Sequence, residues 1–404
     1  MPTKKEVEQV LENRDWDTLK LWASEHRNVY RQLMTRIYVK DGLIFWRAVE
    51  GLGFLVREIE KIKPAFAVEL VRRYFWMLND ESGGTAWNAS EAIGSLLAYN
   101  PKTCGHFNWM LSGLLVDESL KDGALWGLVQ LAQTAPHLVD PLEERISPLL
   151  EDEKPFVRGL AALIYSLVRK PQEDFALYRE QGPKWRVSDE LDQRLKNDQA
   201  RLEIYQDGRF ASYSVQELWQ VPTLAYWSEQ VTISDLEVEI TAAFSAKGLC
   251  WLGIEPIAKE EESLRAWASR RFPKGFLIRK REPNAVVFRQ LSEYFSGQRQ
   301  EFTIPLHQIG TPFQLQVWEE LLRIPYGETR SYGDIAAKVG NPKGSRAVGM
   351  ANNQNPLGIV VPCHRVIGKN GSLTGYAGGL NVKAKLLELE GATDPGHKEE
   401  SADA

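Results

Sequence analysis

A cysteine directly followed by a histidine is the pair of residues in this chain best suited to chemistry. Cys363 and His364 come after an apolar run, 357–361. A buried thiol beside an imidazole is a potential nucleophile with its base. Adjacent side chains often point apart, however, so ordinary packing also explains the pair. A metal site is poorly supported, because no second Cys/His pair lies nearby. Another cysteine, Cys250, lies in an apolar strand and is expected to be an inert core thiol.

The residues before this pair predict two short helices joined by a tight turn. The first helix, 331–339, begins with a capping serine, the turn is 340–342, and the second helix is 343–351. This is the helix-turn-helix arrangement. One long cation, Arg346, projects from the second helix, and its other exposed residues are small: Gly344, Ser345, Ala347 and Gly349. Residues 321–390 carry nine Lys or Arg against four Asp or Glu, which favours a local DNA-binding patch.

The middle of the chain alternates between strand and helix patterns. We expect strands at 231–240, 249–254 and 301–306, and helices at 260–271 and 284–295. Residues 231–308 are therefore predicted to form a small α/β subdomain. The preceding stretch, 171–225, is predicted to hold one helix followed by a linker, and we place that linker at 201–230.

The N-terminal part contains an internal helical repeat. Similar segments begin at Trp46, Trp87, Trp126 and, more weakly, Arg158. The number of residues from the start of one segment to the start of the next is typical of HEAT-like helical hairpins. In such repeats each unit buries its apolar face against its neighbours. Small residues would let the helices approach closely, and the tryptophans would fill the core. Residues 1–200 carry a net charge of −4, which does not favour a DNA groove here, so a protein partner is expected.

Composition narrows the class of protein further. The chain has 404 residues, a net charge of −5, 43% hydrophobic and 25% charged residues, and three dispersed cysteines. This is the balance of a globular protein in a reducing compartment. The sequence predicts no membrane span and no secretion signal. The expected location is therefore cytoplasmic, as in bacteria, or nuclear.

Four motifs in order resemble those of one known family. They are GNPKGSRAVGMANNQNP (340–356), VVPCHRV (360–366), GYAGGL (375–380) and LLELEG (386–391). Over about 230–392 the chain is similar to the O6-alkylguanine-DNA alkyltransferases, also called methylated-DNA–protein-cysteine methyltransferases.

Together, the helical repeat and the resemblance predict a multidomain fold. An all-α HEAT-like solenoid (1–200) and the linker would precede an α/β subdomain (231–308). A helical DNA-binding and active-site subdomain with the helix-turn-helix (309–392) and a polar tail (393–404) would follow.

The resemblance also implies a reaction and a role for each matching residue. A single-turnover enzyme would move an alkyl group from O6 of guanine, or O4 of thymine, in double-stranded DNA to Cys363. It would need no cofactor and no metal, and we expect a monomer. His364 would be the base acting through a water, Glu390 would orient it, Asn355 would hold the active-site turn, and Tyr332 would help rotate the nucleotide out and donate to the guanine. Arg346 would fill the vacated stack, beside Lys343 and the small helix residues. Val366, Tyr376 and Ala377 would line the substrate pocket, and Arg365 would tie the loop internally or contact a phosphate.

Other functions remain open at this point. A non-catalytic lesion binder is disfavoured, because family members of that kind lack the cysteine. A scaffold whose solenoid recruits a protein partner is compatible with repair. A cysteine hydrolase is the least favoured, because no oxyanion-hole motif accompanies Cys363.

Overall fold

The chain forms two compact units. The computed structural model describes residues 2–26, 28–38, 42–63, 65–78, 88–168, 185, 187–255, 260–281 and 283–392. Unit 1 is Met1–Thr223 and unit 2 is Leu224–Ala404. The predicted tail, 393–404, and Trp87 of the predicted repeat lie outside the described residues. Within the described ranges, every helix is too short or too polar to cross a membrane.

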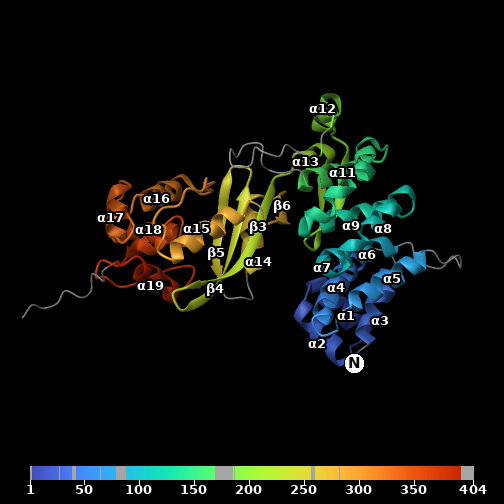
Figure 1. The fold of residues 1–404 in the computed structure, drawn as a ribbon, viewed down its shortest axis with the longest axis horizontal. Coiled ribbons are helices and arrows are strands. Elements are labelled where there is room, and N and C mark those ends of the chain that lie inside the picture. Colours follow the sequence, from blue (N-terminus) through green and yellow to red (C-terminus); the bar gives the residue numbers. More distant parts are fainter. Residues whose placement is uncertain are drawn as a thin grey trace, which may run out of the picture. The chain divides into compact units, whose positions relative to one another are not determined.

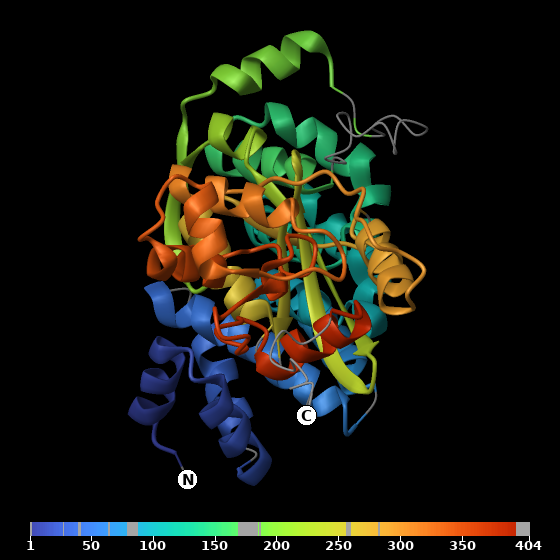
Figure 2. The same ribbon diagram turned by 90° about the vertical axis from the view of Figure 1, so that its left-hand side faces the viewer.

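Unit 1 consists mainly of helices stacked in the order of the sequence (Figure 1). Figure 2 shows the stack from the side, with the N-terminus at one end and α12 at the other. The helices are α1 (Lys4–Asn13), α2 (Trp16–Glu25), α3 (Asn28–Ile37), α4 (Gly42–Glu60), α5 (Phe66–Leu78), α6 (Ala89–Tyr99), α7 (Pro101–Cys104), α8 (Asn108–Gly113), α9 (Lys121–Thr134), α10 (Glu143–Ile146), α11 (Pro155–Val168), α12 (Asp189–Asn197) and α13 (Val215–Trp219). Short 3₁₀ turns lie between them: η2 (Gly105–Phe107), η3 (Leu114–Val116), η4 (Pro136–Leu138), η5 (Asp140–Leu142) and η6 (Ser147–Glu151).

Four of these helices, α4, α6, α9 and α11, contain the repeated segments and pack on one another in succession. Glycines set their closest approach. A Cβ placed on Gly94 of α6 would lie 2.2 Å from the Cα of Gly127 in α9. Trp126 is buried in this stack, with its ring centroid 4.9 Å from that of Trp46. Small residues therefore allow the helix contact, and tryptophans fill the space beside it.

The predicted linker at 201–230 is wrong, because most of it is regular structure. Strands β1 (Arg201–Gln206) and β2 (Arg209–Ser214) form an antiparallel hairpin that belongs to unit 1. Both residues of its loop, Asp207 and Gly208, have positive φ, as two-residue hairpin turns require. The indole Nε1 of Trp126 donates to the carbonyl of Tyr205 at 3.1 Å, which ties the hairpin to α9. Unit 1 therefore extends past the predicted end at residue 200.

Unit 2 opens with a four-stranded sheet in the order β5-β4-β3-β6. Its strands are β3 (Thr223–Ile233), β4 (Leu236–Ser245), β5 (Gly248–Glu255) and β6 (Phe276–Arg279). The single strand predicted at 231–240 is wrong, because the chain turns at Ser234, whose φ is +57°. The alternation of apolar residues shifts by one position at this turn, from Val231 and Ile233 to Leu236, Val238 and Ile240, as expected for two strands joined by a two-residue turn. The strand predicted at 301–306 is also wrong, because that segment forms only an isolated bridge between Leu306 and Leu249.

Helix α14 (Glu260–Arg271) covers this sheet. Its residues Leu264 and Trp267 share a buried cluster with Tyr226 and Cys250. Burial raises the pKa of Cys250 to about 12, and its Sγ donates to the carbonyl of Ala243, so the structure agrees with an inert core thiol.

The remaining elements of unit 2 are mostly short helices, several of them capped by their own sequence. Thr311 and Ser331 each form a capping box at the start of a helix, which confirms the predicted serine cap. The elements are α15 (Ala285–Phe295), α16 (Pro312–Leu322), β7 (Arg330–Ser331), α17 (Tyr332–Lys338), α18 (Ser345–Asn353), η8 (Cys363–Arg365), β8 (Val366–Ile367) and α19 (Leu380–Leu389). The two short strands β7 and β8 pair in parallel, joining the start of α17 to the residues after η8.

The contact between α6 and α9 predicts an unusual response to alanine. Alanine normally favours a helix over glycine by about 1 kcal/mol. We expect Gly94→Ala instead to destabilise unit 1 by about 1–3 kcal/mol, because the new methyl group meets backbone rather than a movable side chain. Urea unfolding of the full chain, followed by circular dichroism, measures the change.

Gly113→Ala at the end of α8 is the matched control, because the nearest atom to its Cβ lies 3.7 Å away. Equal stability of the two variants would contradict the tight glycine contact.

Candidate active site

Cys363 lies at the start of η8, directly after a tightly folded turn. The side chain of Asn355 holds that turn from both sides: its Nδ2 donates to the carbonyl of Val361 at 2.9 Å, and its Oδ1 accepts from the amide of Leu357 at 3.0 Å. Ile359 within the turn has a φ of +67°, a conformation that costs energy in a β-branched residue. The asparagine therefore holds in place a strained loop that leads into the cysteine.

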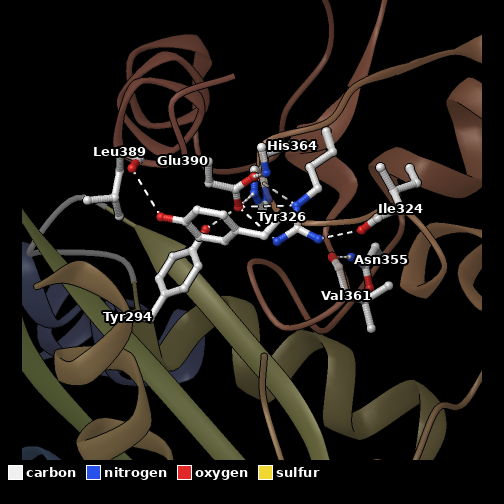
Figure 3. A network of polar contacts seen from close by, with 10 residues as sticks. Tyr294, Ile324, Tyr326, Asn355, Val361, His364, Leu389 and Glu390 are labelled. Atoms are coloured by element: carbon white, nitrogen blue, oxygen red, sulfur yellow. Dashed lines mark hydrogen bonds and ion pairs between the residues drawn. The ribbon is translucent and has the colours of Figure 1, made fainter. Parts of the chain in front are cut away.

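A buried carboxylate, Glu390, lies at the centre of a network of hydrogen bonds and ion pairs (Figure 3). It directly follows α19 and accepts from His364 Nε2 at 2.8 Å. The Arg365 guanidinium donates to both of its oxygens, at 2.9–3.1 Å. The hydroxyl of Tyr294 and the amide of Gly327 complete the shell. A carboxylate without solvent exposure is therefore fully compensated by donors.

The charges in this network determine which nitrogen of His364 carries its proton. Burial alone would raise the pKa of Glu390, but the contacts with His364 and Arg365 lower it to about 2. An ionised carboxylate is only an acceptor, so His364 Nε2 must be the donor. Burial also lowers the pKa of His364, against the opposite effect of Glu390. The imidazole is then neutral, and its buried Nδ1, which has no protein partner among the described residues, is the basic atom.

The thiol of Cys363 is held mainly in its protonated form. It is 5% exposed, and burial raises its pKa above the usual value. The Asn355 amide and the positive charge of Lys383 act in the opposite direction. Lys383 is itself buried, and its ammonium donates to the carbonyls of Val366 and Thr374. Burial lowers its pKa to about 8, so it still carries its charge at neutral pH.

Two tyrosines stand near this thiol. A negative charge on the Cys363 sulfur would raise the pKa of both Tyr332 and Tyr376, although burial is the main cause of the raised values. Tyr332 is half-buried, and its hydroxyl donates to the carbonyl of Thr374 at 3.0 Å. The hydroxyl of Tyr376 is buried and has no partner among the described residues. Such a group is available to a bound molecule.

Helices α17 and α18 form the predicted helix-turn-helix, but of the predicted small residues only Ala347 is fully exposed. Trp318 of α16 fixes α18 by donating to the carbonyl of Ala351 at 2.8 Å. Arg346 and Ala347 of α18 are exposed, and Arg346 makes no ion pair with any described residue. Lys343, just before the helix, is exposed too. The helix therefore offers an open surface with an unengaged cation.

Comparison with known proteins relates this site to one protein family. Residues 312–392 match the family model described as 6-O-methylguanine DNA methyltransferase, DNA binding domain. The inducible methylated-DNA–protein-cysteine methyltransferase of Bacillus subtilis is 48% identical over 172 residues, which cover 42% of this chain and 91% of the relative.

The chain belongs to the methylated-DNA–protein-cysteine methyltransferase family. The Methanosarcina acetivorans methyltransferase is 62% identical over 104 residues, covering 26% of this chain and 67% of the relative. A crystal structure of the Mycobacterium tuberculosis O6-methylguanine methyltransferase is 40% identical and covers 43% of this chain and 96% of that chain, with a TM-score of 0.36. These similarities leave much of unit 1 unaccounted for.

The structure brings together most of the residues that the methyltransferase resemblance singled out. Cys363, His364, Glu390 and Asn355 lie in one buried network or its supporting turn. Arg365 binds Glu390 and the carbonyl of Ile324, so it is an internal partner and not a free phosphate contact. The remaining predicted positions lie nearer the surface or in the neighbouring loop: the DNA-side residues Gly344, Ser345 and Gly349 are half-buried, Val366 is buried and Ala377 is exposed.

Sequence reasoning missed three members of this methyltransferase site: Lys383, Tyr294 and Asn352. Tyr294 comes from α15, almost a hundred residues before Glu390, and Asn352 donates to the carbonyl of Cys363 at 3.2 Å. The one available signal was the placement of Lys383 among the apolar residues of α19, which is weak evidence for a buried ammonium.

The Lys383 charge predicts a pH-dependent change in thiol reactivity. Lys383→Gln retains a donor but removes the cation, so the pKa of Cys363 should rise and its alkylation by iodoacetamide should slow. One pKa unit would correspond to about tenfold in rate wherever the thiol is mainly protonated. Because the pKa of Lys383 is about 8, the difference from the unmodified protein should be largest below pH 8 and should vanish above it.

Lys385→Gln is the control, because Lys385 lies on the same helix but pairs with Asp235 and Glu388. A pH–rate profile for Lys383→Gln that overlaid the profile of this control would exclude an electrostatic effect of Lys383 on the thiol.

Proposed function

We propose that this protein repairs DNA by direct reversal, transferring an alkyl group, in the first instance methyl, from O6 of guanine to Cys363. The observation that carries the proposal is the buried Cys363–His364–Glu390 arrangement, in which the one imidazole nitrogen left without a partner is the basic one. Family membership supports the same reaction, since the relatives are named for methyl transfer from DNA to a protein cysteine.

The proton of the thiol has a defined route in this proposal. Cys363 rests protonated, and His364 Nδ1 takes the proton through a water as the sulfur attacks the alkyl carbon. A bond forms between sulfur and carbon, and the bond between carbon and O6 breaks. Its electron pair goes to the guanine, which takes up a proton, with Tyr332 as the nearby donor. Tyr332 would first have to leave the carbonyl of Thr374.

The product explains why each molecule would react once. A thioether carbon has no good leaving group, so Cys363 would stay alkylated and no cofactor would be needed. The protein is then a single-turnover enzyme. The unpaired hydroxyl of Tyr376 and the backbone at Val366 and Ala377 would recognise the guanine. The carbonyl of Val366 already accepts from Lys383 but retains a second lone pair.

The helix-turn-helix supplies access to a base that is stacked inside the duplex. The base has to rotate out, at a cost of a few kcal/mol. We assign α18 to the minor groove, where its small residues allow close approach and Lys343 contacts phosphate. Arg346 inserts into the gap left by the base. The nine-to-four excess of basic residues over 321–390 favours this orientation towards DNA.

For unit 1 we propose a HEAT-like solenoid. The successive packing of α4, α6, α9 and α11 supports it, and the hairpin β1–β2 packs along this stack, where Tyr205 contacts Trp46 of α4 and Trp126 of α9. In unit 2 we divide the chain into an α/β part up to residue 308 and an active-site part at 309–392. We place the protein, as a monomer, with the cellular DNA in the cytoplasm or the nucleus. A scaffold role of unit 1 towards a protein partner is compatible with repair by unit 2.

Transfer of the alkyl group predicts a defined change in mass. Incubation with duplex DNA containing O6-methylguanine should add about 14 Da, one CH₂, to the peptide that contains Cys363. Cys363→Ala should still bind the DNA but acquire no mass, because the sulfur is the acceptor. Mass spectrometry of the intact and digested protein makes the measurement. Lesion binding without an adduct would favour the non-catalytic lesion binder.

The role of Arg346 predicts a difference between duplex and free base. Arg346→Ala should slow repair in a duplex by about tenfold, equivalent to about 1.4 kcal/mol, because nothing then fills the vacated stack. Reaction with a free O6-alkylguanine base should be unchanged. Single-turnover kinetics on both substrates separate the two effects.

Arg323→Ala is the control, because that arginine pairs with Glu319 and Glu320 on α16. Equal slowing of both substrates by Arg346→Ala would remove the proposed insertion into the stack.

A further inference from the structure

The hydroxyl of Tyr294 is a buried polar group that the proposed repair reaction does not use. Tyr294 lies on α15, in the α/β part of unit 2, and its side chain is fully buried. Its hydroxyl donates to Oε1 of Glu390, which lies 96 residues further along the chain. The α/β part of unit 2 therefore contributes one group to the polar network around His364 (Figure 3).

Tyr294 and His364 donate to the same oxygen atom. Oε1 of Glu390 accepts from His364 Nε2 at 2.8 Å and from the hydroxyl of Tyr294. The Arg365 guanidinium also donates to Oε1, at 2.9 and 3.1 Å. Oε2 accepts from Arg365 at 2.9 Å and from the amide of Gly327 at 3.2 Å. The negative charge that Oε1 presents to the imidazole is therefore shared with the phenol.

Packing holds the phenol in this position. The ring of Tyr294 lies edge-on to Tyr326, with the centroids 5.9 Å apart, and its centroid is 5.2 Å from that of Phe302. Burial and the charge of Glu390 both raise the pKa of Tyr294 above its usual value. The hydroxyl therefore keeps its proton at neutral pH and remains a donor.

Several groups besides Tyr294 act on the imidazole of His364. Burial is the largest cause of its lowered pKa, Glu390 opposes that effect, and the charges of Arg365 and Lys383 add to it. Glu390 is thus the group that makes His364 more basic, and its effect depends on how much of its charge other donors offset. Burial raises the pKa values of the remaining titratable groups of the network, which are uncharged at neutral pH: Cys363, Tyr326 and Tyr376.

We propose that Tyr294 is a positioning residue that limits the basicity of His364 by offsetting part of the charge on Glu390 Oε1. The inference rests on the proposed function, in which Nδ1 of His364 takes the proton of Cys363 through a water. A carboxylate oxygen that loses one donor interacts more strongly with those that remain. The phenol therefore helps to keep the imidazole neutral and able to accept a proton. Through this bond the α/β part of unit 2 acts on a reaction that takes place in the active-site part.

Tyr294→Phe tests this inference, because it removes the hydroxyl and keeps the ring that packs on Tyr326 and Phe302. The pKa of His364 should rise by about 0.5–1 unit, because the phenol no longer offsets the negative charge beside the imidazole. NMR titration of the full chain with labelled histidine rings measures the shift without DNA. An imidazole that titrates at the same pH in both proteins, at lower pH in the variant, or in neither protein would overturn the inference. In the last case burial alone would keep His364 neutral.

Tyr326→Phe is the matched control. Tyr326 contacts the ring of Tyr294, but its hydroxyl donates to the carbonyl of Leu389 at 3.1 Å and not to Glu390. The titration of His364 in this variant should overlay that of the unmodified protein. An equal shift in both variants would mean that altered packing of the rings, and not the lost donor, causes it.

The pH dependence of methyl transfer separates positioning from a merely structural role. The neutral imidazole is the base, so transfer should slow as the pH falls through the pKa of His364. In Tyr294→Phe this acid limb should move to higher pH by the same amount as the titration of His364. A structural role alone would lower the rate by one factor at every pH and leave the limb in place, and that result would overturn the inference.

Failure of this inference and failure of the proposed function have different signatures. If the unmodified protein acquires no methyl group from DNA, the proposed function fails, and the titration of His364 still tests the shared oxygen. If the unmodified protein transfers methyl and Tyr294→Phe has the same titration and the same pH–rate profile, the inference alone fails.

Discussion

Burial of one carboxylate organises the active site. Glu390 has no exposed side-chain surface, so every lone pair it presents has to be matched by a donor. His364, Arg365, Tyr294 and Gly327 supply those donors, and they come from three separate parts of unit 2. The same bonds that compensate the charge fix the imidazole ring and its tautomer. The need to compensate the charge of Glu390 therefore links the stability of unit 2 to the orientation of the His364 imidazole.

In the resting state, neither Cys363 nor His364 is charged, although the neighbouring Glu390 is ionised. Burial keeps the Cys363 thiol protonated and the His364 imidazole neutral, while Arg365 balances the ionised Glu390. A thiolate in the same place would react with many electrophiles. In the proposed reaction, a suppressed thiol with an adjacent base gains its reactivity only when a substrate carbon is positioned against it. For a protein that would be consumed in one turnover, such restraint protects the acceptor.

Unit 1 depends on a different interaction, which is close contact between the backbones of neighbouring helices at their glycines. Gly94 and Gly127 bring α6 and α9 together so closely that their backbones touch, and Gly123 leaves room for the Glu91 carboxylate. Successive helices then present residues of their first two turns to one cavity, which is lined by Trp46, Glu91, Asp122 and Phe156.

The sequence by itself determined the identity of the reactive pair, the helix-turn-helix and the family, because these depend on contiguous motifs such as 360–366 and 340–356. It also indicated the small residues of α18 and the repeat that includes α4, α9 and α11. It did not reveal the hairpin β1–β2 or the turn at Ser234, although both pairs of strands meet around local two-residue turns. It also did not reveal strand β6, because that short strand is settled by its long-range pairing with β3. Only the tertiary structure decided that Tyr294 and Lys383 belong to the site, since distant elements must pack before their side chains can meet.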